Sequence, residues 1–306
     1  RIDSTLCRLT DGERESMRPD TVITLGGAIV SRHIKDWLRN IPELDHWHVG
    51  ISHTTIDCFK HLNRRIDMDA TVFMGQMAAA LQPHRAASQY AALWHEVADR
   101  ARRLHDAYVA AAPWSDLKAM AGIFARLPRR CNLHLSNGTP IRYAQLLNHP
   151  RIHRSECNRG VSGIDGCTST ALGASVYYLD STLLISGDMS FQYDLAALSS
   201  TLMTPRFKMI VICNGGGGIF RFIPATSSLP ETERYFAVGT RLPLRDLCNG
   251  YGIAFFEADS DESLAESMQA MLAVTDRPAL LAVHTPPEIS ALTLKNYFTH
   301  PTAGKV

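Results

Sequence analysis

The sequence predicts an α/β protein of two doubly wound domains, each with a parallel sheet. Short apolar runs of strand length alternate with longer segments of helical spacing, a pattern typical of parallel sheets covered by helices. The chain has 306 residues, of which 45% are hydrophobic and 20% charged. At roughly 100–200 residues per domain, this is enough material for about two globular domains.

The first third of the chain carries three apolar runs of strand length: Thr21–Leu25, His48–Ser52 and Ala70–Met74. Gly26-Gly27 ends the first run, and the spacing of Ser31–Arg39 predicts an amphipathic helix. Gln82-Pro83-His84 interrupts the alternation. We therefore expect a domain boundary near residue 85, separating a central domain of residues 1–85 from a second domain of residues 86–306.

The second domain opens with a long predicted helix from Ala86 to about Val109, which is Ala-rich and carries charges at helical spacing. Five strands are predicted after it: Asn132–Leu135, Thr182–Ser186, Phe207–Cys213, Ile253–Phe256 and Ala279–Val283. Six helices are predicted among them: Trp114–Leu127, Pro140–Asn148, Asp165–Leu179, Leu195–Met203, Leu244–Tyr251 and Asp261–Val274. In such doubly wound sheets, ligands bind outside the carboxyl ends of the strands.

Composition excludes several classes of function. Lys plus Arg total 31 against 30 for Asp plus Glu, so a net charge of +1 gives no field for nucleic acid or an anionic membrane. No apolar run approaches the roughly 18 residues of a membrane-spanning helix. Arg1 opens the chain without a Met or the apolar core of a signal peptide, which indicates a processed, subcloned or incomplete N-terminus.

The cysteines and histidines give no sign of a structural metal site. The seven cysteines are odd in number and form no CxxC, so we expect neither a disulfide framework nor a zinc ribbon, and a reducing, cytoplasmic location. Thirteen histidines are scattered, and the densest group is His46, His48 and His53. We interpret these three as packed or surface residues of a strand and its following loop.

Two predicted strand ends carry unusual residues. Gly187-Asp188 follows one strand, and Asn214 with four glycines, Gly215 to Gly218, follows the next. The intervening segment has room for one crossover helix, so both can reach the same edge of a parallel sheet. Carboxylate, amide and carbonyl oxygens suit Mg²⁺, and glycines let the backbone approach a diphosphate. Either motif alone fits an ordinary turn or loop, whereas the pair resembles the thiamine-diphosphate signature, with Cys213 replacing the first residue of its NN pair.

A third segment narrows the resemblance. Residues 158–166 read NRGVSGIDG, and together with GDxSF at Gly187 and NGGGGIF at Asn214 they closely resemble the 2-succinyl-5-enolpyruvyl-6-hydroxy-3-cyclohexene-1-carboxylate synthase (MenD) family. Leu135–Arg142 is similar to the family's NSxxxR segment, and Arg18 through His33 is similar to its central domain. The resemblance covers nearly the whole chain.

The resemblance implies a thiamine diphosphate cofactor with Mg²⁺ or Mn²⁺. The metal ligands would be Asp188, Asn214 and the carbonyl of Gly216. The implied cofactor-binding residues are Gly163, Ile164, Gly187, Asp188, Met189, Ser190, Asn214, Gly216, Ile219 and Phe220. Within this set, Ile164 would prop the cofactor in its bent form. Ile219, Phe220 and Ile223 would surround the thiazolium with apolar atoms, which favour its reactive form.

The implied reaction is decarboxylation of 2-oxoglutarate and addition of the succinyl carbanion to isochorismate, in menaquinone biosynthesis, by a homo-oligomer (dimer or tetramer). Both substrates are polyanions, and Arg142 and Arg159 match family residues that bind their carboxylates. Arg32 and His33 match a basic pair of the central domain, with His33 replacing the usual Lys or Arg. Gly138 stands where the family usually has a substrate-contacting Ser, and Ile223 completes the predicted substrate residues.

The resemblance also implies a missing part. Family members carry a preceding pyrimidine-binding domain whose Glu activates the cofactor, and no Glu in this chain lies in a matching motif. We therefore expect no catalytic residue of that kind here, and an isolated fragment without turnover. Two alternatives stay open: an acetolactate-synthase-like carboligase or decarboxylase, and a non-catalytic α/β protein that binds only diphosphate and Mg²⁺.

Overall fold

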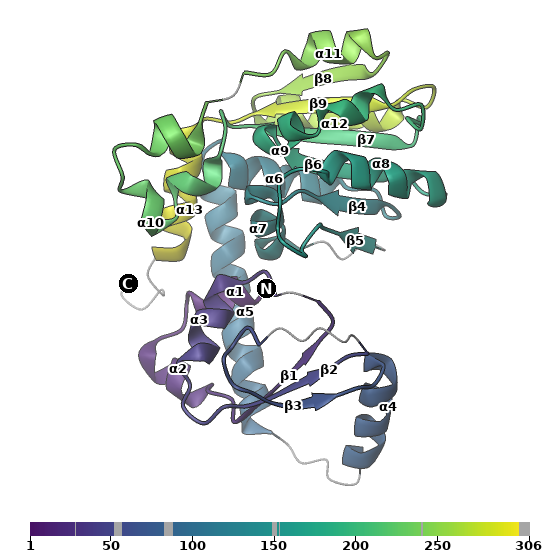
Figure 1. Ribbon diagram of the computed structural model, residues 1–306. Helices are drawn as coiled ribbons and strands as arrows, with labels where there is room; N and C mark the ends of the chain where they lie inside the picture. Colours follow the sequence, from purple (N-terminus) through teal and green to yellow (C-terminus); the bar gives the residue numbers. More distant parts are fainter. Residues whose placement is uncertain are drawn as a thin grey trace. The chain divides into compact units, whose positions relative to one another are not determined.

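The computed structural model describes residues 1–27, 29–51, 57–82, 88–148, 152, 154–239 and 241–299 (Figure 1). The chain divides into two compact units, one containing residues 1–105 and the other residues 106–300. The division falls inside the long helix α5 (Gln89–Ala111), which the sequence predicted over nearly the same residues. The boundary expected near residue 85 lies among residues 83–87, outside the described residues.

The first unit contains a three-stranded parallel sheet in the order β1-β2-β3, formed by Thr21–Leu25, Asp45–Val49 and Leu62–Ile66. The helices described before α5 are α1 (Ile2–Leu6), α2 (Asp11–Ser16), α3 (Arg32–Arg39) and α4 (Ala70–Leu81). Leu6, Met17, Trp37, Phe59 and Val97 belong to its hydrophobic core. Val97 comes from α5, so the first half of that helix completes this core.

One predicted strand of the first unit is wrong. Ala70–Met74 forms the start of helix α4, because the Asp69 carboxylate accepts the backbone N–H groups of Thr71 and Val72 at 2.9 and 3.2 Å and caps the helix. A short apolar run does not distinguish strand from helix, and the capping Asp decides between them. The third strand is instead the polar Leu62–Ile66, and the second begins three residues before the predicted His48.

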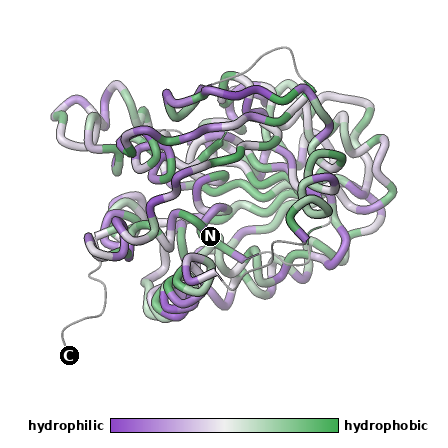
Figure 2. The backbone as a smooth tube through the Cα atoms, turned by 90° about the horizontal axis from the view of Figure 1, so that it is seen from below, coloured by the Kyte–Doolittle hydropathy of each residue, from purple (hydrophilic) through white to green (hydrophobic). Residues whose placement is uncertain are grey.

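The second unit contains a six-stranded parallel sheet in the order β5-β4-β6-β7-β9-β8. Its strands are β4 (Asn132–Leu135), β5 (Arg154–Glu156), β6 (Thr182–Gly187), β7 (Phe207–Cys213), β8 (Ala254–Ala258) and β9 (Ala279–His284). The inner strands are almost wholly buried, and parallel strands coloured as hydrophobic run through the centre of Figure 2. Both sheets are parallel throughout, as the sequence predicted.

The helices of the second unit are α6 (Asp116–Arg126), α7 (Thr139–Leu146), α8 (Cys167–Tyr177), α9 (Asp188–Tyr193), α10 (Pro224–Ser227), α11 (Leu244–Gly250), α12 (Asp261–Ala273) and α13 (Pro287–Thr299). Five of the six predicted helices are confirmed to within a few residues at their ends. The sixth, predicted over Leu195–Met203, is a short 3₁₀ helix over Leu195–Ser199. The sequence did not predict α9, α10, α13 or the polar edge strand β5.

The strand order fixes where a ligand can bind. From β4 the chain adds β5 on one side and then crosses back to add β6 and β7 on the other, so the direction of winding reverses between β4 and β6. At such a switch point, the loops after two adjacent strands diverge and leave a crevice at the carboxyl edge. In the described residues, no helix combines the length and apolar character needed to cross a membrane.

Candidate functional site

A cavity of about 310 Å³ opens at the carboxyl edge of the large sheet, around this switch point. Loops after β4, β6 and β7 line it, together with the segment before α8. Most of the residues predicted from the sequence line this cavity: Gly138, Arg142, Arg159, Ile164, Gly187, Asp188, Met189, Ser190, Asn214, Gly216, Ile219 and Phe220. Segments that lie up to 82 positions apart in the chain, from Gly138 to Phe220, thus meet at one site.

The Asp188 carboxylate is fixed at the end of β6. It is 4% exposed and begins helix α9. Its Oδ1 accepts the N–H of Met189 at 2.7 Å, and its Oδ2 accepts the N–H groups of Gly215 and Gly216, each at 2.9 Å. The bonds from Gly215 and Gly216 join the end of β6 to the loop after β7, so the two strand-end motifs meet as predicted from their positions on neighbouring parallel strands.

The glycine loop after β7 packs closely against the backbone of Ala237 and Val238. Gly216 has φ of +109°, and a Cβ there would lie 2.3 Å from the carbonyl oxygen of Ala237 and 2.7 Å from that of Val238. The N–H of Gly217 donates to the Ala237 carbonyl at 2.7 Å, and the N–H of Gly218 donates to the Gly216 carbonyl at 2.6 Å. The loop therefore requires glycine for close packing as well as for backbone conformation.

Arg221 and Asp116 hold Asn214 from two sides. The Arg221 guanidinium donates to the carbonyls of Asn214 and Gly215 at 3.3 and 3.2 Å, and it pairs with Glu233. The Asn214 amide donates to the buried Asp116 carboxylate at 2.8 Å. Burial raises the pKa of Asp116, and hydrogen bonds from Thr285, Asn214 and Ser290 partly offset this effect. Neither Arg221 nor Asp116 is among the site residues predicted from the sequence.

Asn137, which follows β4, organises the loop that carries Arg159. Its amide donates to the carbonyls of Asn158 and Gly163 at 2.7 and 2.6 Å, and its Oδ1 accepts Nη1 of Arg159 at 2.7 Å. Nε of Arg159 is buried and has no hydrogen-bond partner among the described residues. A buried guanidinium donor without a partner at a cavity wall suits an anionic ligand. Asn137 could have been selected by its place at a strand end.

An apolar wall completes the cavity. Ile164, Ile219 and Phe220 line it, and the Phe220 ring lies 5.7 Å from that of Phe236 between centroids. The Ser190 hydroxyl donates to the Ile164 carbonyl at 2.6 Å, which ties the loop before α8 to helix α9. Gly138 has φ of +96°, a conformation that L side chains rarely adopt, so a residue with a side chain would be strained there.

Four predicted residues do not line this cavity. The carbonyl of Gly163 accepts a hydrogen bond from the Asn137 side-chain amide, which ties the loop before α8 to the end of β4. Ile223 precedes helix α10 as its N-cap. Arg32 and His33 belong to the first unit, at the start of α3. There Arg32 pairs with Asp36 at 3.3 Å, and His33 lines a separate cavity of about 330 Å³.

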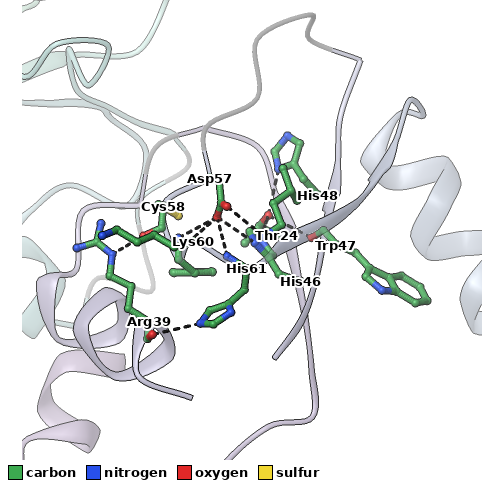
Figure 3. Close-up of polar contacts among 11 residues, drawn as sticks. Thr24, Arg39, His46, Trp47, His48, Asp57, Cys58, Lys60 and His61 are labelled. Carbon is green, nitrogen blue, oxygen red and sulfur yellow. Dashed lines mark hydrogen bonds and ion pairs between the residues drawn. The ribbon is translucent and has the colours of Figure 1, made fainter. Parts of the chain in front are cut away.

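Two histidines of the first unit lie in strand β2, where His46 is buried and His48 is half-buried. Among the described residues, no three His, Cys, Asp or Glu side chains are grouped so as to hold a metal ion. The Thr24 hydroxyl lies 3.0 Å from both His46 Nε2 and His48 Nδ1, and Asp57 lies on the other side of His46 (Figure 3). His53 lies outside the described residues.

The donors at the cavity of the six-stranded sheet fit a divalent metal held together with a diphosphate. Asp188, Asn214 and the Gly216 carbonyl supply a carboxylate, an amide and a backbone oxygen, which are hard ligands of the kind Mg²⁺ and Mn²⁺ take. The Gly216 carbonyl keeps a second lone pair beyond its bond to Gly218. Gly187 adds room, because a Cβ there would meet no atom within 4 Å.

Comparison with known proteins confirms the predicted resemblance. The chain is 40% identical over an alignment of 296 residues to the 2-succinyl-5-enolpyruvyl-6-hydroxy-3-cyclohexene-1-carboxylate synthase of Porphyromonas gingivalis, and the match covers 94% of the chain. It is 36% and 34% identical, over 98% of its length, to proteins of that name from Flavobacterium psychrophilum and Flavobacterium johnsoniae. The chain spans about half the length of these relatives, 51–54%. No family model matches it.

Proposed function

We propose that this chain, a homologue of the 2-succinyl-5-enolpyruvyl-6-hydroxy-3-cyclohexene-1-carboxylate synthases along nearly its whole length, forms the part of such an enzyme that binds thiamine diphosphate by its diphosphate end. The observation that carries the proposal is the convergence of Asp188, Asn214, Gly216 and Arg159 on one cavity at the switch point of the sheet. The relatives' names favour this reaction over the acetolactate-synthase-like and non-catalytic alternatives.

Asp188, Asn214 and the Gly216 carbonyl would hold Mg²⁺ or Mn²⁺, whose positive charge would offset the negative charge of the diphosphate. The backbone N–H donors on Asp188 fix its carboxylate before any ligand arrives, so little reorganisation is needed on binding. When bound, thiamine diphosphate supplies a thiazolium carbon through which a 2-oxo acid can lose CO₂ and pass on its acyl unit.

The apolar side chains Ile164, Ile219 and Phe220 would exclude water from the thiazolium end of the site. Arg159 and Arg142 would bind substrate carboxylates, with Asn137 fixing the direction of the Arg159 guanidinium. These assignments suit polyanionic substrates, and we propose 2-oxoglutarate and isochorismate, joined in a step of menaquinone biosynthesis.

We also propose that the complete protein is a cytoplasmic homo-oligomer. Tyr177 and Leu179, at the end of α8, are 86% and 88% exposed, and large apolar side chains left open to water favour contact with another chain. All seven cysteines are free thiols, which accords with a reducing compartment.

The test uses the native, complete protein that contains this chain. It should consume 2-oxoglutarate and isochorismate together, release CO₂, and require both thiamine diphosphate and a divalent metal. Pyruvate offered alone is the control, since an acetolactate-type enzyme would turn it over. Cofactor-dependent turnover of pyruvate without consumption of 2-oxoglutarate would refute the proposed substrates, and turnover without thiamine diphosphate would refute the proposed cofactor.

A further inference from the structure

Asp116 is a buried carboxylate outside the cavity lining. It is the first residue of α6, follows the N-cap Ser115, and is 1% exposed. Three side chains donate to it: Asn214 Nδ2 to Oδ2 at 2.8 Å, and the hydroxyls of Thr285 and Ser290 to Oδ1 at 2.5 and 3.2 Å. The donors come from the loop after β7, the end of β9 and helix α13.

Burying a carboxyl group lowers the stability of the fold unless hydrogen bonds compensate for the lost water, and Asp116 receives three such bonds from side chains. Oδ2 of Asp116 accepts Nδ2 of Asn214 at 2.8 Å, so the donor end of the Asn214 amide faces Asp116.

An asparagine side chain has two ends of nearly equal shape, one a donor and one an acceptor, and only its partners decide which end faces which way. For Asn214 the backbone is already fixed, since Arg221 holds its carbonyl and that of Gly215. Asp116 therefore acts on the direction of the Asn214 side-chain amide and not on the Asn214 backbone.

We propose that Asp116 is a positioning residue for the metal site: it binds Nδ2 of Asn214 and thereby turns Oδ1 of Asn214 toward the metal. The inference rests on the proposed function, because it assigns Asp116 a role only if Asn214 is a metal ligand. An amide turned the other way would present N–H groups to a cation and supply no oxygen ligand.

Two variants separate positioning from structural support. In Asp116→Leu nothing directs the Asn214 amide, and we expect Mn²⁺ to bind at least tenfold more weakly in the presence of thiamine diphosphate. In Asp116→Asn the new amide can accept from Nδ2 or donate to Oδ1 of Asn214, so both orientations are populated and we expect a loss of about three- to tenfold. Asn has nearly the same shape as Asp, so Asp116→Asn can still be measured if Asp116→Leu does not fold.

Thr285→Val is the matched control. It removes a hydrogen bond to the same carboxylate, through Oδ1, and leaves the contact of Oδ2 with Asn214. We expect it to lower the urea midpoint of unfolding about as much as Asp116→Asn does, while Mn²⁺ affinity stays within twofold of wild type.

The measurement is Mn²⁺ affinity by electron paramagnetic resonance, on the native, complete protein with thiamine diphosphate, beside urea denaturation of each variant. Weaker Mn²⁺ binding by folded Asp116→Asn, with Thr285→Val unaffected, supports the inference. Wild-type Mn²⁺ affinity in folded Asp116→Asn, or equal losses in Asp116→Asn and Thr285→Val, overturns it. A wild-type protein that binds neither Mn²⁺ nor thiamine diphosphate instead refutes the proposed function, so the two failures are distinguishable.

Discussion

The Asp188 carboxylate accepts the backbone N–H of Gly216 at 2.9 Å, which joins the end of β6 to the glycine loop after β7. This bond brings the one carboxylate of the predicted metal site beside the one predicted backbone ligand. It also explains why the two motifs have to follow adjacent parallel strands, since β6 and β7 end at the same edge with Gly187 opposite Ile212.

Replacing Asp188 should abolish metal-dependent binding of the cofactor. Asp188→Ala removes the only charged ligand proposed for the metal and three acceptor contacts with backbone N–H groups. We expect thiamine diphosphate to bind at least about a hundredfold more weakly with Mg²⁺, which corresponds to roughly 2.8 kcal/mol. Calorimetric titration measures it, with the exposed Asp276→Ala as control. Unchanged affinity in Asp188→Ala would remove Asp188 from the site.

Arg159 should matter to the substrates more than to the fold. Arg159→Ala leaves a substrate carboxylate without its partner, and we expect kcat/KM to fall by an amount equivalent to about 2–5 kcal/mol. Arg159→Lys keeps the charge but loses the Nε donor, so it should recover only part of this loss. Steady-state kinetics on both substrates checks it. The control is Arg154→Ala, an exposed arginine paired with Glu156, and values within twofold of wild type for Arg159→Ala would contradict the role.

The glycine loop should tolerate no side chain at Gly216. Gly216→Ala places a Cβ within 2.3 Å of a backbone oxygen at φ of +109°, so we expect it to lower the free energy of unfolding by about 2–4 kcal/mol. Gly250→Ala at the end of α11, where a Cβ meets no atom within 4 Å, should leave stability unchanged or slightly raised. Chemical denaturation distinguishes them, and equal stability of the two variants would show that the loop is less tightly packed than described.

Stability should fall in mild acid because of His46. It is 1% exposed, and burial lowers its pKa below the ordinary value of about 6.5, with Asp57 only partly offsetting this and His48 and His61 adding to it. The unfolded chain then binds a proton that the folded chain does not. The neutral imidazole therefore contributes its full stability above about pH 6.5, and this is lost progressively as the pH falls toward the lowered pKa.

The corresponding measurement is the free energy of unfolding from pH 8 to 5, followed by tryptophan fluorescence. His46→Gln should flatten the decline below about pH 6.5, since it has no proton to take up in the unfolded state. His95→Gln, an exposed histidine of α5, should leave the decline as it is. An unaltered pH profile in His46→Gln would assign the decline to other groups.

The sequence predicted every strand of the large sheet except the polar edge strand β5, and it missed β3 at the edge of the small sheet. β6, β7 and β9 are apolar because both their faces are buried, so their composition alone identifies them. β5 (Arg154–Glu156) and β3 (Leu62–Ile66) are polar, and only pairing with a neighbour makes them strands. Intrinsic preference is weak in such edge strands, and tertiary context decides.

The sequence motifs contain most of the residues that line the cavity, but they do not contain Asp116, which contacts Asn214 from outside it. Asp188 and Asn214 stand in recognisable motifs at strand ends, whereas Asp116 lies 98 positions before Asn214 and follows no motif. Its partnership depends on how α6, β9 and α13 pack, which no local pattern contains. Asn137 is an intermediate case. The sequence shows that it follows a predicted strand, but it does not show the three hydrogen bonds that Asn137 makes with the Asn158–Gly163 loop.

Anomalous diffraction from crystals of the complete protein grown with thiamine diphosphate and Mn²⁺ would locate the metal in the cavity. We predict a single strong Mn²⁺ peak at the carboxyl edge of β6 and β7, within bonding distance of Asp188, Asn214 Oδ1 and the Gly216 carbonyl, with diphosphate oxygens completing the coordination. Bound thiamine diphosphate with no Mn²⁺ peak among these three groups, or with its diphosphate in another cavity, would contradict this prediction.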